Sequence, residues 1–107
     1  MKKLLDALEK FEAARGWDAY NRIETDEERL LELRNTAFYL IGELGELANE
    51  IKKGIRDQKY NDEHIKEEIT DVFMFLMKLS RIAKMDLEAE FYKKLAHNEE
   101  RFAHFVK

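Results

Sequence analysis

The sequence contains no cysteine and no proline, and only four of its 107 residues are glycine. Without cysteine, disulfide bonds, thiolate metal sites and thiol nucleophiles are excluded. Proline and glycine are the residues that most often interrupt helices, so their scarcity favours long helices over sheets. With 45% hydrophobic and 39% charged residues, the composition predicts one all-α domain over residues 1–107.

Long apolar runs are also absent, and none approaches the length needed to cross a membrane. Near the N-terminus, Asp6 follows too soon for the apolar region of a signal peptide. We therefore expect a cytoplasmic protein with no membrane partner. The formal net charge of -4 argues against nucleic-acid binding, which depends on a basic face, but is compatible with a small anionic ligand held through a metal.

Hydrophobic spacing predicts four helices. We expect Gly16 and Gly54 to end the first two, a capping box of Thr25 and Glu28 to begin the second, and Asp86 to cap the fourth. The third is apolar on more than one side, which in so short a chain indicates a subunit interface. The prediction is a four-helix bundle assembled as an oligomer. The expected helices span residues 2–16, 26–53, 62–84 and 87 onward.

Two glycines, Gly42 and Gly45, lie inside the second predicted helix. Each costs roughly 1 kcal/mol of helix propensity relative to alanine. A close approach of a neighbouring helix or a ligand would explain them, and a kink or simple tolerance are the alternatives.

Acidic residues border the apolar stripes of the second and third predicted helices. Glu43, Glu46 and Glu50 fall within about 60° of one another around the helix axis. Glu68 and Asp71 are likewise three apart and lie beside apolar residues. If the two helices pack through these stripes, the carboxylates converge, and desolvation and repulsion would raise their pKa values and oppose folding.

A divalent cation would remove this conflict. Carboxylate oxygens suit Mg²⁺, which usually binds through a few carboxylates together with substrate phosphates. Neither acidic pair has a lysine or arginine one turn away. The pattern therefore predicts a magnesium site, with Mn²⁺ as an alternative ion, for a phosphate-bearing ligand. The competing interpretation is a non-catalytic helical oligomer that binds a regulatory partner and whose acids line a solvated groove.

Other polar residues offer fewer mechanisms. The three histidines, His64, His97 and His104, lack the spacing of a zinc site and are expected on the surface. No phosphate-binding glycine loop and no nucleophile elbow is present. On the last predicted helix one face carries three polar residues at i, i+4 and i+7, either as a solvated face or as a phosphate-binding one. These residues are Lys94, Asn98 and Arg101.

Together these motifs resemble the MazG-like all-α nucleoside triphosphate pyrophosphohydrolases, whose signature is ExxE, a variable spacer, ExxD, and a later Lys and Asn. The resembling segments are residues 42–46, 67–71 and 94–101. Residues 15–18 and 34–35 resemble the dCTP-cleaving branch of that family more weakly. The related phosphoribosyl-ATP pyrophosphohydrolases share the bundle and its acidic helices, but the spacing of Lys94 and Asn98 fits them less well.

The resemblance implies Mg²⁺-dependent hydrolysis of a nucleoside triphosphate to the monophosphate and pyrophosphate, in nucleotide-pool sanitation. It also implies a homodimer or homotetramer that shares its sites between subunits. The implied metal ligands are Glu43, Glu46, Glu68 and Asp71.

The resemblance further assigns roles in substrate binding and catalysis. Lys94 and Asn98 would contact the triphosphate, with help from Arg101. Lys94 would also stabilise charge on the departing pyrophosphate. Trp17 would stack on the base, although a hydrophobic anchor under the end of the bundle is an equal alternative for this residue. We expect Glu46 or Glu43 to activate the attacking water.

Three departures from the dCTP-cleaving branch concern the base. Asn21 stands where that branch tends to have histidine, Lys53 where it has tryptophan, and residues 22–33 resemble an insertion. The sequence therefore predicts the phosphate and metal site but not the preferred base.

Overall fold

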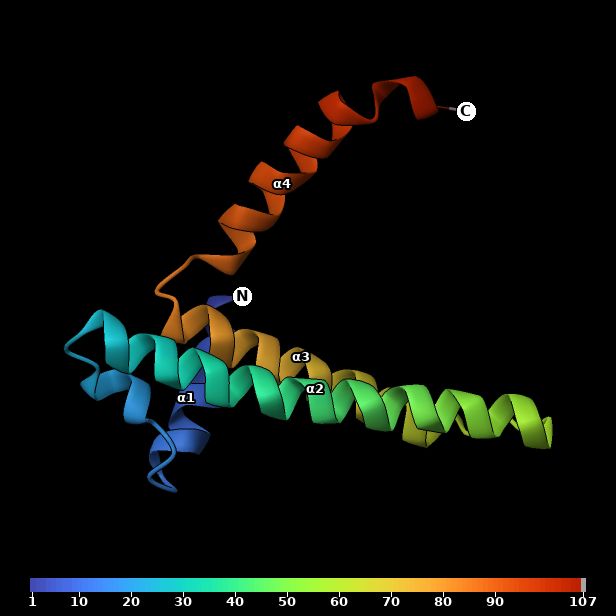
Figure 1. Cartoon of the computed structure of the whole chain (residues 1–107), viewed down its shortest axis with the longest axis horizontal. Coiled ribbons are helices and arrows are strands. Elements are labelled where there is room, and N and C mark those ends of the chain that lie inside the picture. Colours follow the sequence, from blue (N-terminus) through green and yellow to red (C-terminus); the bar gives the residue numbers. More distant parts are fainter. Residues whose placement is uncertain (107) are drawn as a thin grey trace.

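The computed structural model describes residues 1–106, which form four α-helices and two short 3₁₀ helices (Figure 1). These residues include no strand, so the predicted all-α class is confirmed. None of the helices in this range is long and apolar enough to cross a membrane. In chain order the elements are α1 (Lys2–Ala13), η1 (Ala19–Arg22), α2 (Asp26–Asp57), α3 (Asp62–Ile82), α4 (Leu87–Arg101) and η2 (Ala103–Phe105).

The centre of the molecule is a long antiparallel hairpin of α2 and α3, which lie side by side, with α1 packed against α3 (Figure 1). Tyr39 on α2 and Phe75 on α3 stack across the hairpin with ring centroids 6.0 Å apart. Three hydrophobic side chains are buried in the described chain: Tyr20, Met77 and Ile82. This small core lies where α1, η1 and the C-terminal half of α3 meet.

The predicted helix starts are confirmed by the caps. The side chain of Thr25 accepts a hydrogen bond from the Glu28 amide at 3.1 Å, and Asp86 accepts one from the Ala89 amide at 3.0 Å. Both bonds satisfy amides that have no partner inside their own helix. At the end of α1 the chain turns at Gly16, whose φ of 71° lies in the left-handed region that favours glycine.

The predicted end of α2 at Gly54 is wrong, because the helix continues to Asp57. Gln58 takes the left-handed cap position, with a φ of 54°, and the Lys59 amide donates to the Gly54 carbonyl at 2.9 Å. Gly54 serves a different purpose: a Cβ at this position would lie 2.8 Å from the Lys59 carbonyl oxygen. The glycine therefore allows the chain to fold back over the last turn of the helix.

The close approach expected at Gly42 and Gly45 is not found within the chain. A Cβ at either position would meet nothing within 4 Å, and α2 runs through both without interruption. The two glycines instead leave an open strip of helix surface beside the acidic residues of α2.

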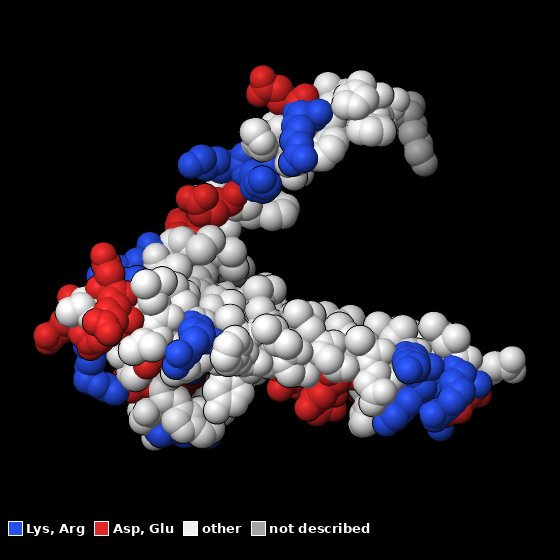
Figure 2. Space-filling model, in the orientation of Figure 1, with Lys and Arg blue, Asp and Glu red and all other residues white. Residues whose placement is uncertain are grey.

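Large apolar side chains remain exposed on all four α-helices of the described chain, most of them on α2, α3 and α4. On α3 they recur at i, i+4 and i+7, and so form one face. Figure 2 shows a long, largely uncharged face along the α2–α3 hairpin, with acidic side chains gathered at its edge. In Figure 1, α4 leads away from the hairpin, and apolar side chains of this helix are exposed. The exposed residues include Phe38 and Ile41 on α2, Ile69, Phe73 and Leu76 on α3, and Phe91 and Leu95 on α4.

Substitution of Gly54 by alanine should destabilise the protein by about 1–3 kcal/mol, because the new methyl group would meet a backbone carbonyl that cannot move aside freely. Gly45→Ala is the matched control and should stabilise by up to about 1 kcal/mol, since its methyl group meets open space. Urea unfolding followed by circular dichroism at one protein concentration measures both. Equal stability of Gly54→Ala and the wild type would contradict the argument.

Candidate active site

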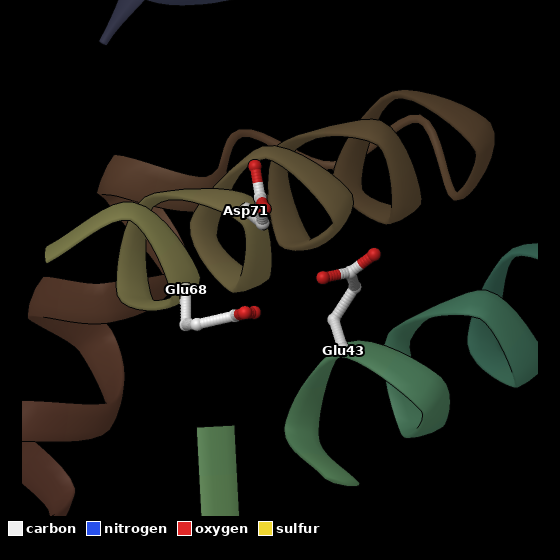
Figure 3. A group of neighbouring side chains, drawn as sticks. All are labelled: Glu43, Glu68 and Asp71. Carbon is white, nitrogen blue, oxygen red and sulfur yellow. The ribbon is translucent and has the colours of Figure 1, made fainter. Parts of the chain in front are cut away.

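Three carboxylates from two helices meet on the seam between α2 and α3 (Figure 3). Glu43 projects from α2, and Glu68 and Asp71 project from α3; one oxygen of each lies within 4.8 Å of the others. We call these residues the carboxylate trio. All three side chains are half-buried, and Figure 3 shows Glu43 and Glu68 pointing toward one another. The predicted convergence of the two acidic motifs is therefore present within one chain.

The trio lacks the partners that usually accompany such crowded acids. Within residues 1–106, the Oε2 atoms of Glu43 and Glu68 are shielded from solvent and have no hydrogen-bond partner. None of the ion pairs in this range involves a member of the trio. Buried acceptor atoms without donors are costly, and oxygen atoms in this arrangement are the ligands that a hard divalent cation prefers. The donor set therefore fits such an ion.

The pKa values of the two glutamates in the trio are raised. Partial burial is the largest cause for Glu43, and the neighbouring charges of Glu46, Asp71 and Glu68 add to it, so that its pKa lies above the usual 4.5. The pKa of Glu68 is raised in the same way, first by burial and then by Glu46 and Asp71. The repulsion expected from the sequence is therefore present in the structure.

The other two acids of the α2 strip differ from Glu43. Glu46 is exposed and is not part of the trio, yet its charge raises the pKa of both glutamates in the trio, so it lies beside them. Glu50 is engaged elsewhere: its Oε2 lies 3.6 Å from Nδ1 of His64 on α3. His64, like His97 and His104, is exposed, as expected.

A pocket of about 240 Å³ adjoins the trio, and Trp17 lines it together with Glu43 and Asp71. Trp17 is 56% exposed and meets the ring of Phe11 edge-on, with centroids 6.0 Å apart. Its amide donates to the Glu12 carbonyl at 2.9 Å, which fixes the residue at the end of α1. The remaining lining residues are Leu8, Phe11, Glu12, Met74, Phe75 and Lys78.

The predicted phosphate-binding residues lie elsewhere in the chain. Lys94, Asn98 and Arg101 are on α4, which projects away from the hairpin, so the fold of one chain does not bring them to the trio (Figure 1). Lys94 and Arg101 are exposed. Oδ1 of Asn98 is shielded and has no hydrogen-bond partner within residues 1–106.

A network of polar side chains in this pocket was not predicted from the sequence. Glu12 is buried, accepts a hydrogen bond from the Tyr20 hydroxyl at 2.9 Å, and lies 3.2 Å from the Lys78 ammonium. Burial and the bond to Glu12 raise the pKa of Tyr20 well above its usual range. The signal that could have revealed it is Lys78 itself, the one charged residue in the apolar run 72–79.

A family model described as MazG nucleotide pyrophosphohydrolase domain matches residues 32–105. This range contains the carboxylate trio and the three predicted phosphate-binding residues of α4, Lys94, Asn98 and Arg101. The comparison with curated proteins and the comparison with solved structures each gave no significant match.

Removing one charge from the trio should stabilise the metal-free protein, so Glu68→Gln should raise its Tm at pH 7. The folded-state pKa of Glu68 is raised, so protonation favours folding; this contribution is present below the unfolded value of 4.5 and is lost as pH rises through the folded pKa. Glu68→Gln should therefore also flatten this part of the pH dependence. Thermal unfolding with a chelator present, from pH 4 to 8, measures both effects.

The matched control is Glu67→Gln, which removes a charge from the neighbouring exposed residue outside the trio. It should change the Tm less. A lower Tm for Glu68→Gln than for the wild type would contradict the prediction, because it would show that repulsion within the trio does not destabilise the metal-free protein.

Proposed function

Because the chain belongs to the MazG nucleotide pyrophosphohydrolase family, we propose that it hydrolyses a nucleoside triphosphate to the monophosphate and pyrophosphate with Mg²⁺ bound at the carboxylate trio. The observation that carries the proposal is the pair of shielded, unpartnered oxygens of Glu43 and Glu68 on the α2–α3 seam. An interaction module whose acids merely face solvent would leave no such atoms. Mn²⁺ would satisfy the same oxygen ligands.

The trio would hold the ion, and Glu46 would complete the acidic surface beside it. When bound, Mg²⁺ would supply the positive charge that neutralises the phosphate oxygens and polarises the α-phosphorus. The repulsion among the carboxylates is relieved on binding, so the site favours a metal-bound state over an empty one.

Glu46 is the better placed of the two candidate bases, since Glu43 is taken up by the trio. Its exposed carboxylate would accept a proton from water as the water oxygen attacks the α-phosphorus. The bond between that phosphorus and the bridging oxygen to the β-phosphate would break, releasing pyrophosphate. Lys94 would stabilise the charge that develops on this leaving group, as a point cation does.

The pocket beside the trio would receive the base. Trp17 offers an exposed aromatic face on which a base can stack. This face lies near the metal site, because Glu43 and Asp71 line the same pocket. A site that binds phosphates by charge and a base by stacking can accept a nucleoside triphosphate. We propose that the substrate is a deoxynucleoside triphosphate or an aberrant one. Removal of such nucleotides from the cellular pool is the biological role we propose.

We also propose that the working enzyme is a homodimer or homotetramer of this chain. Residues 1–106 bury only three hydrophobic side chains and leave apolar faces of α2, α3 and α4 exposed, more than a stable monomer usually shows. The exposed stripe of Phe91 and Leu95 on α4 lies beside Lys94 and Asn98. Packing of this stripe on a second copy would carry both polar residues toward the partner's carboxylate trio.

Pyrophosphate release from a panel of canonical and modified nucleoside triphosphates, with and without Mg²⁺, tests the activity. We expect release that depends on the metal and falls by at least about 100-fold in Glu68→Gln, because loss of a direct ligand should exceed the effect of an outer-shell change. Glu67→Gln should retain activity. Silence across the panel at high enzyme concentration would reject the hydrolase, and full activity of Glu68→Gln would reject Glu68 as a ligand.

Mixing two inactive variants tests whether the site is shared between copies. In a dimer, Glu68→Gln keeps a sound α4 and Lys94→Ala keeps a sound trio, so a mixed dimer has one intact site. After denaturation and co-refolding of equal amounts, about a quarter of wild-type activity should return, because half of the dimers are mixed. No recovery, in a mixture shown by mass spectrometry to contain mixed dimers, would place Lys94 and Glu68 in the same chain's site.

A further inference from the structure

Aromatic and aliphatic side chains line the pocket beside the carboxylate trio, together with a pair of opposite charges. Lys78 of α3 and Glu12 of α1 line it, and the Lys78 ammonium lies 3.2 Å from Oε2 of Glu12. The other oxygen of Glu12 accepts the Tyr20 hydroxyl at 2.9 Å. Both carboxylate oxygens of Glu12 therefore have a partner, and the position of the Lys78 ammonium is fixed by one of them.

Lys78 has donor capacity left over. An ammonium group carries three N–H donors. Within the described residues one is directed to Glu12, and a second to the Trp17 carbonyl oxygen at 3.4 Å. The side chain is only 21% exposed, yet it lines the pocket. The ammonium also lies over the Tyr20 ring, 5.9 Å from its centroid, a distance at which the ring accepts no conventional hydrogen bond. The third donor is therefore available to a group that enters the same pocket as the Trp17 ring.

Structure alone does not require this charged pair. A partly buried ion pair is often replaceable by apolar residues without loss of stability. The same α1–α3 interface already has a second ion pair, in which Arg81 lies 2.5 Å from Glu9, and that pair does not line the pocket. Binding of a ligand therefore explains the Glu12–Lys78 ion pair in this pocket better than the packing of α1 on α3 does.

We propose that Lys78, oriented by Glu12, donates a hydrogen bond to a carbonyl oxygen of the substrate's base. The site then prefers triphosphates of bases that carry such a carbonyl, of which uracil and thymine are the simplest, over those of adenine, which has an amino group instead. A phosphate is a poorer fit for this ammonium, because Glu12 already neutralises it and repels anions. The volume of about 240 Å³ also suits one ring system, since pockets that hold whole ligands begin at roughly 300 Å³.

This inference rests on the proposed function, because that function supplies the triphosphate substrate. Recognition of the nucleobase does not depend on hydrolysis, so it is tested separately. Trp17 is the only tryptophan in the chain and gives a single indole N–H signal in a ¹⁵N–¹H correlation spectrum. Titration with deoxyuridine, without metal or phosphate, should move this signal saturably, and deoxyadenosine should bind more weakly. Lys78→Met should weaken deoxyuridine binding by about tenfold or more, the usual effect of losing a hydrogen bond to a charged group, and leave deoxyadenosine unchanged.

The kinetic test compares dUTP with dATP. Lys78→Met should lower kcat/KM for dUTP by about 10- to 100-fold while changing that for dATP by less than about twofold. Arg81→Met is the matched control: it breaks an ion pair of the same interface outside the pocket and should preserve the dUTP preference. The double variant Glu12→Gln/Lys78→Met leaves no unpaired buried charge, so it keeps the fold in place while lacking the donor.

The results of these experiments distinguish a failure of the proposed hydrolysis from a failure of base recognition by Lys78. If no triphosphate is hydrolysed, the proposed function fails, but the indole titration still tests base recognition. If Lys78→Met and the double variant, both shown to be folded, bind deoxyuridine and deoxyadenosine as the wild type does, Lys78 does not read the base. An equal fall in kcat/KM for dUTP and dATP would likewise overturn the inference, because it would indicate a purely structural role.

Discussion

Repulsion among Glu43, Glu68 and Asp71 is the constraint on which the rest of the structure depends. The α2–α3 hairpin forms because two apolar stripes pack, and that packing forces three carboxylates to within 4.8 Å of one another. Two of their oxygens are left shielded and without donors. Folding therefore creates an electrostatic conflict that the described chain does not resolve, and a bound cation is the simplest means of resolving it.

The second unresolved feature is the exposed apolar surface. A hairpin with α1 packed at one end buries few hydrophobic side chains, and α4 projects from it with Phe91 uncovered. Because hydrophobic burial is the main driving force for folding, such a chain would gain stability from the association that we propose. The polar residues of α4 lie beside this apolar stripe, so the association that covers the stripe would also bring Lys94 and Asn98 to a partner's trio. Stability and completion of the site would then have one cause.

In the function that we propose, the pocket next to the trio would combine two kinds of recognition. Trp17 and Phe11 provide aromatic surface on which any base could stack. Lys78, fixed by Glu12, would add direction, because a fixed donor distinguishes a carbonyl from an amino group. α1 positions both, since Trp17 is bound to the end of that helix through the Glu12 carbonyl. Residues 1–20 therefore contribute to the site although they lie outside the segment that matches the family model.

Sequence alone determined the helices and the acidic pairs. Periodicity and caps place Thr25 and Asp86 at helix starts, and these are local properties that a helix expresses wherever it packs. The end of α2 was missed because Gly54 looks like a stop signal, while its true purpose is a contact with Lys59 that only the folded-back chain makes. Which acids meet was only partly foreseeable: Glu43 joins the trio, but Glu46 lies beside it and Glu50 pairs with His64.

Only the tertiary structure revealed the pairing of Glu12 with Lys78 and the distance of α4 from the trio. Glu12 and Lys78 come from helices far apart in the sequence, and although Lys78 stands out in its apolar run, nothing in the sequence says that Glu12 is its partner. Their partnership depends on how α1 lies against α3, which no spacing within one helix encodes. Local periodicity fixes which side of a helix a residue occupies, whereas the packing of helices decides what that side meets.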